Sequence, residues 1–204
     1  IPDQIEAGTY MAAVAATGGQ ILVKNIIPKH MDCITAKLQE CGVEVEEQDD
    51  TLLVRRTARL KKANVKTLPY PGFPTDLQSP LMALMAAGNG NGEIRETVFE
   101  ERFGTAEELR KLGARIEIQK DRARIHGMYP LRGETVQAAD LRGGAALVIA
   151  GLAAEGVTKI QNSHHIFRGY EDICGDLRAL GARVRYKDLI QRPYTKTGEC
   201  TRNL

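Results

Sequence analysis

Three stretches of the chain repeat one order of hydrophobic and polar positions. Each has an Ala-rich apolar run, a Gly-containing break, a β-rich segment, an amphipathic segment of helical period and a final Gly. The apolar runs span residues 11–16, 81–87 and 145–154. Because they are apolar on nearly every side, we predict that they form helices buried at the centre of the fold.

The segments after each apolar run predict a strand, a second helix and a pair of strands. In the first repeat these are a strand over 20–25, a helix over 32–41 and strands over 43–47 and 52–55. In the second they are a strand over 93–99, a helix over 105–112 and strands over 115–118 and 122–126. In the third they are a strand over 157–161, a helix over 170–180 and one strand over 183–186.

Leading strands are predicted over 64–67 and 134–137, so each repeat has the order β-α-β-α-β-β. The first repeat has no room for this strand, and the third has no evident partner for its last one. Gly42, Gly113 and Gly181, where the second helices should end, are spaced by 71 and 68 residues. The repeats cover about 1–58, 64–127 and 134–187, and this spacing indicates an internal repeat.

The repeat predicts a mixed α/β fold, of the α+β or α/β class. Helices that each bury a face on a sheet would pack together inside, with the sheets outside. We assign residues 1–187 to one domain and 188–204 to a carboxy-terminal tail.

Composition narrows the class of protein. The chain has 204 residues, 43% hydrophobic and 26% charged, which is typical of a folded globular protein. Its 28 Lys and Arg against 26 Asp and Glu give a formal charge of +2, so no basic field favours nucleic acid or an anionic membrane. No apolar run approaches the roughly 20 residues of a membrane span, and we expect a cytoplasmic protein.

The cysteines and histidines give no metal pattern. The four cysteines show no C-x-x-C spacing and are expected to be reduced thiols; they are Cys33, Cys41, Cys174 and Cys200. The adjacent pair His164 and His165 suits neither a helix face nor a strand face for chelation. We therefore expect no metal and no cofactor.

A loop at residues 73–80, Phe-Pro-Thr-Asp-Leu-Gln-Ser-Pro, leads directly into the second apolar run. Pro74 extends the residue before it, and Asp76 should lie at the positive end of a helix. The plainest interpretation is that Asp76 only caps this helix. Glu6 and Asp140 occupy equivalent helix starts, so all three carboxylates could be caps.

Arginines near the other repeat openings give Asp76 a second interpretation. Arg102 and Arg168 follow the central strands of repeats two and three, and Arg142 lies two residues into the third opening. If the repeats are symmetric, these arginines converge with Asp76 at one end of the domain. Guanidinium groups beside helix N-termini are typical of a phosphate or carboxylate site, and a carboxylate among them could act as a base for a hydroxyl.

Several motifs carry a family resemblance. They are the segments 1–9, 73–78, 96–103 (Glu-Thr-Val-Phe-Glu-Glu-Arg-Phe), 140–142 (Asp-Leu-Arg) and 168–171 (Arg-Gly-Tyr-Glu). In this order and spacing the chain resembles the UDP-N-acetylglucosamine enolpyruvyl transferases, from Ile1 to about Lys187. The resemblance implies an inside-out α/β barrel of two domains, each made of three β-α-β-α-β-β units.

The resemblance also implies an activity. Members transfer the enolpyruvyl group of phosphoenolpyruvate to the 3-hydroxyl of UDP-N-acetylglucosamine by addition and elimination, in the first committed step of peptidoglycan synthesis. Asp76 would take the hydroxyl proton and Val98 would contact the sugar. Arg102, Arg142 and Arg168 would face the phosphate and carboxylate of phosphoenolpyruvate.

The resemblance gives three acidic residues supporting positions. Asp140 and Glu100 would hold the arginines, and Asp3 would line the hinge side of the cleft. Glu101 stands where the family usually has Asn, and Gly143-Gly144 where a bulkier residue is common.

The expected domain is one half of the family's enzyme. The other domain, the loop carrying its Cys or Asp general acid, and the amino-terminal Lys-Asn pair have no counterpart in this sequence, so the chain alone should be inactive. The alternatives are the shikimate-pathway enolpyruvyl transferase (EPSP synthase), a non-catalytic paralogue that binds a protein partner, and an RNA-end-processing relative, which the 5% aromatic content disfavours.

The tail and the last strand raise one further expectation. A sheet edge beside residues 183–186 would expose unpaired backbone groups. Residues 188–192 of the tail could cover it, or a second copy of the chain could do so in a homodimer.

Overall fold

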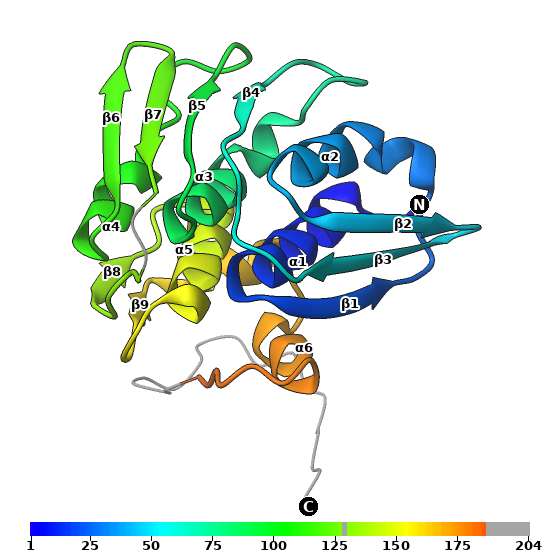
Figure 1. The fold of residues 1–204 in the computed structure, drawn as a ribbon. Helices are drawn as coiled ribbons and strands as arrows, with labels where there is room; N and C mark the ends of the chain where they lie inside the picture. Colours follow the sequence, from blue (N-terminus) through cyan, green and yellow to red (C-terminus); the bar gives the residue numbers. More distant parts are fainter. Residues whose placement is uncertain (128–129, 187–204) are drawn as a thin grey trace, which may run out of the picture.

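Three helices that contact one another form the centre of the structure, a computed structural model that describes residues 1–127 and 130–186 (Figure 1). These helices are α1 (Gln4–Thr17), α3 (Gln78–Ala87) and α5 (Leu141–Ala153). Every residue of α3 is buried, as are most residues of α1 and a continuous run of α5. The prediction that the Ala-rich runs form buried helices is therefore confirmed.

The first sheet is antiparallel and has the order β1-β3-β2. Its strands are β1 (Gly19–Val23), β2 (Glu44–Gln48) and β3 (Thr51–Arg56). Val54 is fully buried and Leu52 nearly so, whereas most of β2 is exposed, so one face of this sheet meets the helices and the other meets solvent.

The second sheet has the order β4-β5-β7-β6 and adds a parallel strand at its edge. Its strands are β4 (Asn64–Lys66), β5 (Asn91–Arg95), β6 (Arg115–Gln119) and β7 (Arg122–His126). Strands β5, β7 and β6 repeat the order of β1, β3 and β2. The third sheet pairs β8 (Thr135–Gln137) with β9 (Lys159–Gln161) in parallel, as β4 pairs with β5.

Shorter or outer helices complete the fold. These are α2 (Pro28–Glu40), η1 (Thr75–Leu77), α4 (Thr105–Lys111), η2 (Ser163–Arg168) and α6 (Ile173–Ala179). Within the described ranges, no helix is long and apolar enough to cross a bilayer. Cys33, Cys41 and Cys174 are free thiols; Cys200 lies outside those ranges.

The structure corrects several predicted boundaries. Helix α2 begins at Pro28 rather than at residue 32, because Pro is well suited to a first helical turn. Strand β5 ends at Arg95, and the predicted strand residues 96–99 have no regular structure at 96–97 and a bend at 98–99. Helix α1 is capped by Asp3, whose Oδ1 accepts from the backbone N–H of Ile5 at 2.7 Å, so Glu6 lies in the first turn and is not the cap.

The third repeat departs most from the prediction. A helix was expected over 170–180, but η2 precedes a shorter α6 that starts after its cap Asp172. Residues 182–186 have no regular secondary structure, so the strand predicted over 183–186 is wrong. With no paired partner strand, the alternating pattern there is not enough to form one. Residues 187–204, which include the tail at 188–204, lie outside the described residues, as do the docking and dimer expectations that involve the tail.

Candidate active site

Asp76 lies in the short helix η1, which leads into the buried helix α3. Its carboxylate makes no capping hydrogen bond to either helix, so the interpretation of Asp76 as only a cap is wrong. The carboxylate instead accepts from two arginines. Arg102 Nη2 donates to Oδ1 at 2.7 Å, and Arg142 Nη2 donates to Oδ2 at 3.2 Å. The predicted meeting of Asp76 with these two arginines is present in the structure.

The two arginines come from different repeats. Arg102 lies in the turn between β5 and α4, and its guanidinium lies 5.0 Å from the centroid of the Phe99 ring. Arg142 is in the first turn of α5, whose start is fixed by Asp140. Asp140 Oδ1 accepts from the backbone N–H of Gly143 at 2.7 Å. Asp140 is therefore a true N-cap that places Arg142 beside Asp76.

Hydroxyl oxygens accept a further hydrogen bond from each arginine. Arg102 Nη1 donates to Thr75 Oγ1 at 2.8 Å, and Arg142 Nη1 donates to the Tyr170 hydroxyl at 3.4 Å. Tyr170 is 1% exposed, and its hydroxyl lies 2.7 Å from Thr9 Oγ1. Thr9 gives its single hydroxyl hydrogen to the Ile5 carbonyl at 2.8 Å. Tyr170 must therefore donate to Thr9, which leaves its lone pairs for Arg142.

The electrostatics of Asp76 follow from this arrangement. Burial acts to raise the pKa of its carboxyl, but the hydrogen bonds and positive charges of Arg102 and Arg142 outweigh burial and hold the pKa below the usual value of 3.8. Burial raises the pKa of Tyr170, partly offset by Thr9 and Arg142. At neutral pH the site is thus an ionised carboxylate between two guanidinium groups, with a protonated phenol behind one of them.

Within the described part of the chain, the other predicted site residues make no hydrogen bond or ion pair with Asp76, Arg102 or Arg142. Arg168 ends η2 and is exposed; Glu100 is exposed in the turn that carries Arg102. Among the described residues, no ion pair joins an arginine to Glu100 or to Asp140. Val98 is half-buried, and Asp3 is the exposed cap of α1.

Four supporting residues were not predicted from the sequence: Thr9, Thr75, Glu96 and Tyr170. All four fall inside the quoted motifs, but motif position alone does not say which side chains meet. Glu96 had one available signal, since it is a carboxylate directly after a buried strand. In the structure it is 3% exposed and accepts a hydrogen bond from Thr75.

The arrangement has a clear chemical capacity. Asp76 is half-exposed and can accept a hydrogen bond or a proton from a hydroxyl, while the guanidinium groups can bind an anion through paired N–H donors. In the part of the chain that the structure describes, no group of three or more His, Cys, Asp or Glu side chains could hold a metal ion.

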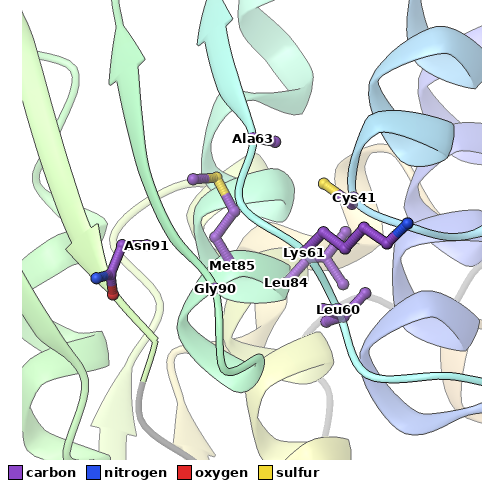
Figure 2. Close-up of a pocket in the computed structure, with 8 residues that line it drawn as sticks. All are labelled: Cys41, Leu60, Lys61, Ala63, Leu84, Met85, Gly90 and Asn91. Atoms are coloured by element: carbon purple, nitrogen blue, oxygen red, sulfur yellow. The ribbon is translucent and has the colours of Figure 1, made fainter.

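A small pocket elsewhere shares no residue with this site (Figure 2). It lies at the carboxyl end of α3, about 12 Å along the helix from Asp76. Its lining is mainly apolar, and Cys41 in it is buried, which raises the pKa of the thiol to about 12. A thiol with so little thiolate is a poor nucleophile.

Comparison with known proteins defines the class. Residues 1–177 match the family described as EPSP synthase (3-phosphoshikimate 1-carboxyvinyltransferase), and the chain belongs to this family. The solved enolpyruvyl transferase NikO from Streptomyces tendae aligns with a TM-score of 0.80 and 33% identity, over 91% of this chain and 44% of that one. The EPSP synthase from Acinetobacter baumannii aligns with a TM-score of 0.58 and 15% identity, over 81% of this chain and 42% of that one, which supports the fold alone.

Relatives matched by sequence carry a more specific name than the family model does. The chain is 54% identical over 184 residues to UDP-N-acetylglucosamine 1-carboxyvinyltransferase 3 of Caldanaerobacter subterraneus subsp. tengcongensis, covering 90% of this chain and 44% of that protein. It is 50% identical to UDP-N-acetylglucosamine 1-carboxyvinyltransferase of Desulfofundulus thermocisternus, covering 90% of this chain and 76% of that protein. The chain thus spans less than half the length of the first of these relatives.

Proposed function

We propose that this chain is the catalytic half of an enzyme that transfers the enolpyruvyl group of phosphoenolpyruvate to the 3-hydroxyl of UDP-N-acetylglucosamine and releases phosphate. The observation that carries the proposal is the Asp76 carboxylate held between Arg102 and Arg142. This site offers a proton acceptor for a sugar hydroxyl beside donors for an anionic substrate. Relatives with 54% and 50% identity carry the corresponding name.

The residues divide into those that act on the sugar, which accepts the enolpyruvyl group, and those that bind phosphoenolpyruvate, which donates it. Asp76 accepts the hydroxyl proton of the sugar, and the half-buried Val98 contacts the sugar moiety. Arg102, Arg142 and Arg168 bind the phosphate and carboxylate of phosphoenolpyruvate. Arg168 is exposed and so is free to approach a bound substrate.

The acidic residues around them have supporting roles. Asp140 positions Arg142 through its cap on α5. Glu100 lies in the Arg102 turn, and Asp3 caps α1 on the hinge side of the cleft.

We propose that residues 1–187 form one domain with three repeats of a β-α-β-α-β-β unit arranged as an inside-out barrel, of which the second repeat alone is complete among the described residues. The complete β4-to-β7 unit and the shared strand order of the first two sheets support this arrangement. A second domain of the same enzyme would supply the general acid that protonates the substrate methylene, and we place the enzyme in the cytoplasm.

Two alternatives are less well supported. An EPSP synthase would use a different acceptor hydroxyl, but the solved EPSP synthase is only 15% identical to this chain. A paralogue that only binds a partner would have no need for the Asp76 cluster, in which two arginines donate to the carboxylate and to neighbouring hydroxyls.

The test is phosphate release by the full-length protein that contains this chain. We expect release from phosphoenolpyruvate when UDP-N-acetylglucosamine is present, and none with shikimate 3-phosphate as the acceptor. Release with shikimate 3-phosphate alone would support the EPSP synthase alternative. Release with neither acceptor would support the non-catalytic one.

A further inference from the structure

Glu96 is a buried carboxylate to which the proposed function assigns no role. It directly follows β5, is 3% exposed and accepts four hydrogen bonds at 2.8–3.1 Å. The donors to Oε1 are Thr67 Oγ1 and the backbone N–H groups of Val98 and Phe99, and the donor to Oε2 is Thr75 Oγ1. A buried carboxylate is tolerated only when it is satisfied in this way.

These contacts join the two loops that make the site. Through Val98 and Phe99, Glu96 fixes the start of the turn that carries Arg102. Through Thr75, it holds the residue immediately before Asp76. Glu96 therefore holds both loops that carry the Asp76–Arg102 pair.

The direction of each hydrogen bond follows from counting hydrogens. Thr75 has a single hydroxyl hydrogen and donates it to Glu96 Oε2 at 2.8 Å. Its lone pairs then face Arg102 Nη1, which donates to it at 2.8 Å. Glu96 thus sets the orientation in which Thr75 can accept from Arg102, and that contact helps direct Nη2 onto Asp76.

We infer that Glu96 is a positioning residue for the reaction, acting through the Thr75 hydroxyl to hold Arg102 against the Asp76 carboxylate. The inference rests on the proposed function for its kinetic consequence, but its geometric part stands on the contacts alone. Glu96 touches neither the guanidinium nor the Asp76 carboxylate, so its effect passes entirely through Thr75 and the turn.

Two substitutions separate positioning from simple support of the fold. Glu96→Gln can keep its amide oxygen on the three Oε1 donors, while its amide nitrogen replaces Oε2 and removes the acceptor for Thr75. Thr75→Val removes the hydroxyl that donates to Glu96 Oε2 and leaves the three donors to Oε1 in place. Thr75→Ser keeps the hydroxyl and should restore function.

The experiment measures kcat and KM for these variants in the full-length enzyme. We expect kcat to fall by about tenfold or more in Glu96→Gln and Thr75→Val, since a hydrogen bond to a charged group is lost. The KM for the nucleotide sugar should change less than about threefold, because the backbone contacts of the Val98 turn remain. Thr75→Ser should stay within about twofold of wild type.

The matched control is Glu93→Gln on the same strand. Glu93 pairs with Arg122 and Arg124 outside the site, so this variant should keep wild-type kcat. If kcat in Glu96→Gln and Thr75→Val matches the control, or if Thr75→Ser fails as badly as Thr75→Val, the inference is wrong.

A crystal structure of Thr75→Val gives a test independent of activity. We expect Arg102 Nη2 to move off Asp76 Oδ1, to which it now donates at 2.7 Å. If the contact between Arg102 Nη2 and Asp76 Oδ1 is unchanged in Thr75→Val, the inference is wrong, whatever the kcat of this variant. If wild type releases no phosphate, the proposed function fails while this measurement still decides the geometric part.

Discussion

Asp76 has two properties that oppose each other in the resting site. The two guanidinium groups keep its carboxylate ionised and in place, but they also make it a weaker base. Any anion that takes up the hydrogen bonds of Arg102 or Arg142 competes with Asp76 for them. Binding of such an anion would therefore raise the basicity of Asp76 at the moment when a proton acceptor is needed.

Replacing Asp76 by Asn tests the base at the scale of one residue. In the full-length enzyme we expect kcat to fall by about 100-fold or more, because the amide cannot take the hydroxyl proton. The free energy of unfolding should change by about 1 kcal/mol or less, since the pair is partly exposed. Steady-state kinetics and thermal unfolding measure the two effects, and an unchanged kcat would refute the assignment.

The lowered pKa of Asp76 also predicts a pH dependence of stability. Since the folded state holds the pKa below 3.8, ionised Asp76 stabilises the fold fully above that pH. This contribution is lost as the pH falls from 3.8 through the lower folded-state pKa. The stability difference between wild type and Asp76→Asn, measured by urea unfolding, should be constant above about pH 5 and shrink below 3.8. If the stability difference between wild type and Asp76→Asn grows as the pH falls, this prediction is wrong.

At the scale of elements, the start of α5 depends on two small residues. A Cβ on Gly144 would lie 2.6 Å from Ile166 Cγ1 and 3.2 Å from Ala138 Cβ, and one on Gly143 would lie 2.7 Å from Thr105 Oγ1. The absence of side chains here lets α5 approach η2 and α4 closely. The glycine pair thus sets the position from which Arg142 reaches Asp76.

Gly144→Ala should disturb this contact. We expect the free energy of unfolding to fall by about 1–3 kcal/mol, because Ile166 is buried and cannot move aside freely. Gly104→Ala is the control, since its backbone is helical and nothing lies within 4 Å of the added carbon. Chemical denaturation of both variants gives the comparison, and equal stability of the two would contradict the close-packing argument.

The elements of the second repeat could be predicted from sequence because each has an unambiguous period and its partner strands are all present. The predicted pair at 115–118 and 122–126 is found as β6 and β7 within one residue. The strand expected at 183–186 failed because alternation does not reveal whether a partner strand exists. The helix start at Asp76 and its meeting with Arg102 and Arg142, 26 and 66 residues away, followed from the pattern and the repeat symmetry. The supporting hydroxyls of Thr75 and Tyr170 did not, because a sequence pattern does not say which side chains the folded chain brings to the guanidinium groups.

At the scale of the whole molecule, the site draws on all three repeats. Thr9 comes from the first, Glu96 and Asp76 from the second, and Arg142 and Tyr170 from the third. The contacts on this path run without a break from α1 to β5. A substitution in any repeat can therefore disturb the position of Asp76.

The isolated chain should fold but not turn over substrate. A carboxylate base without the general acid of the second domain cannot complete addition across the double bond. We expect a cooperative unfolding transition for residues 1–204 together with no phosphate release from phosphoenolpyruvate and UDP-N-acetylglucosamine above a buffer control. Turnover by the isolated chain would contradict the assignment of the general acid to a second domain.

The hydrogen bond between Thr9 and Tyr170 has a consequence for synthesis on the ribosome. Its partners are 161 residues apart, whereas Asp76 and Arg102 are separated by only 26. The carboxylate can meet Arg102 once the second repeat has been made, but Arg142 gains its phenol support only after Tyr170 has been added. The centre is therefore assembled in two stages during synthesis, and a nascent chain that ends before residue 170 lacks the support of Arg142 from the Tyr170 hydroxyl.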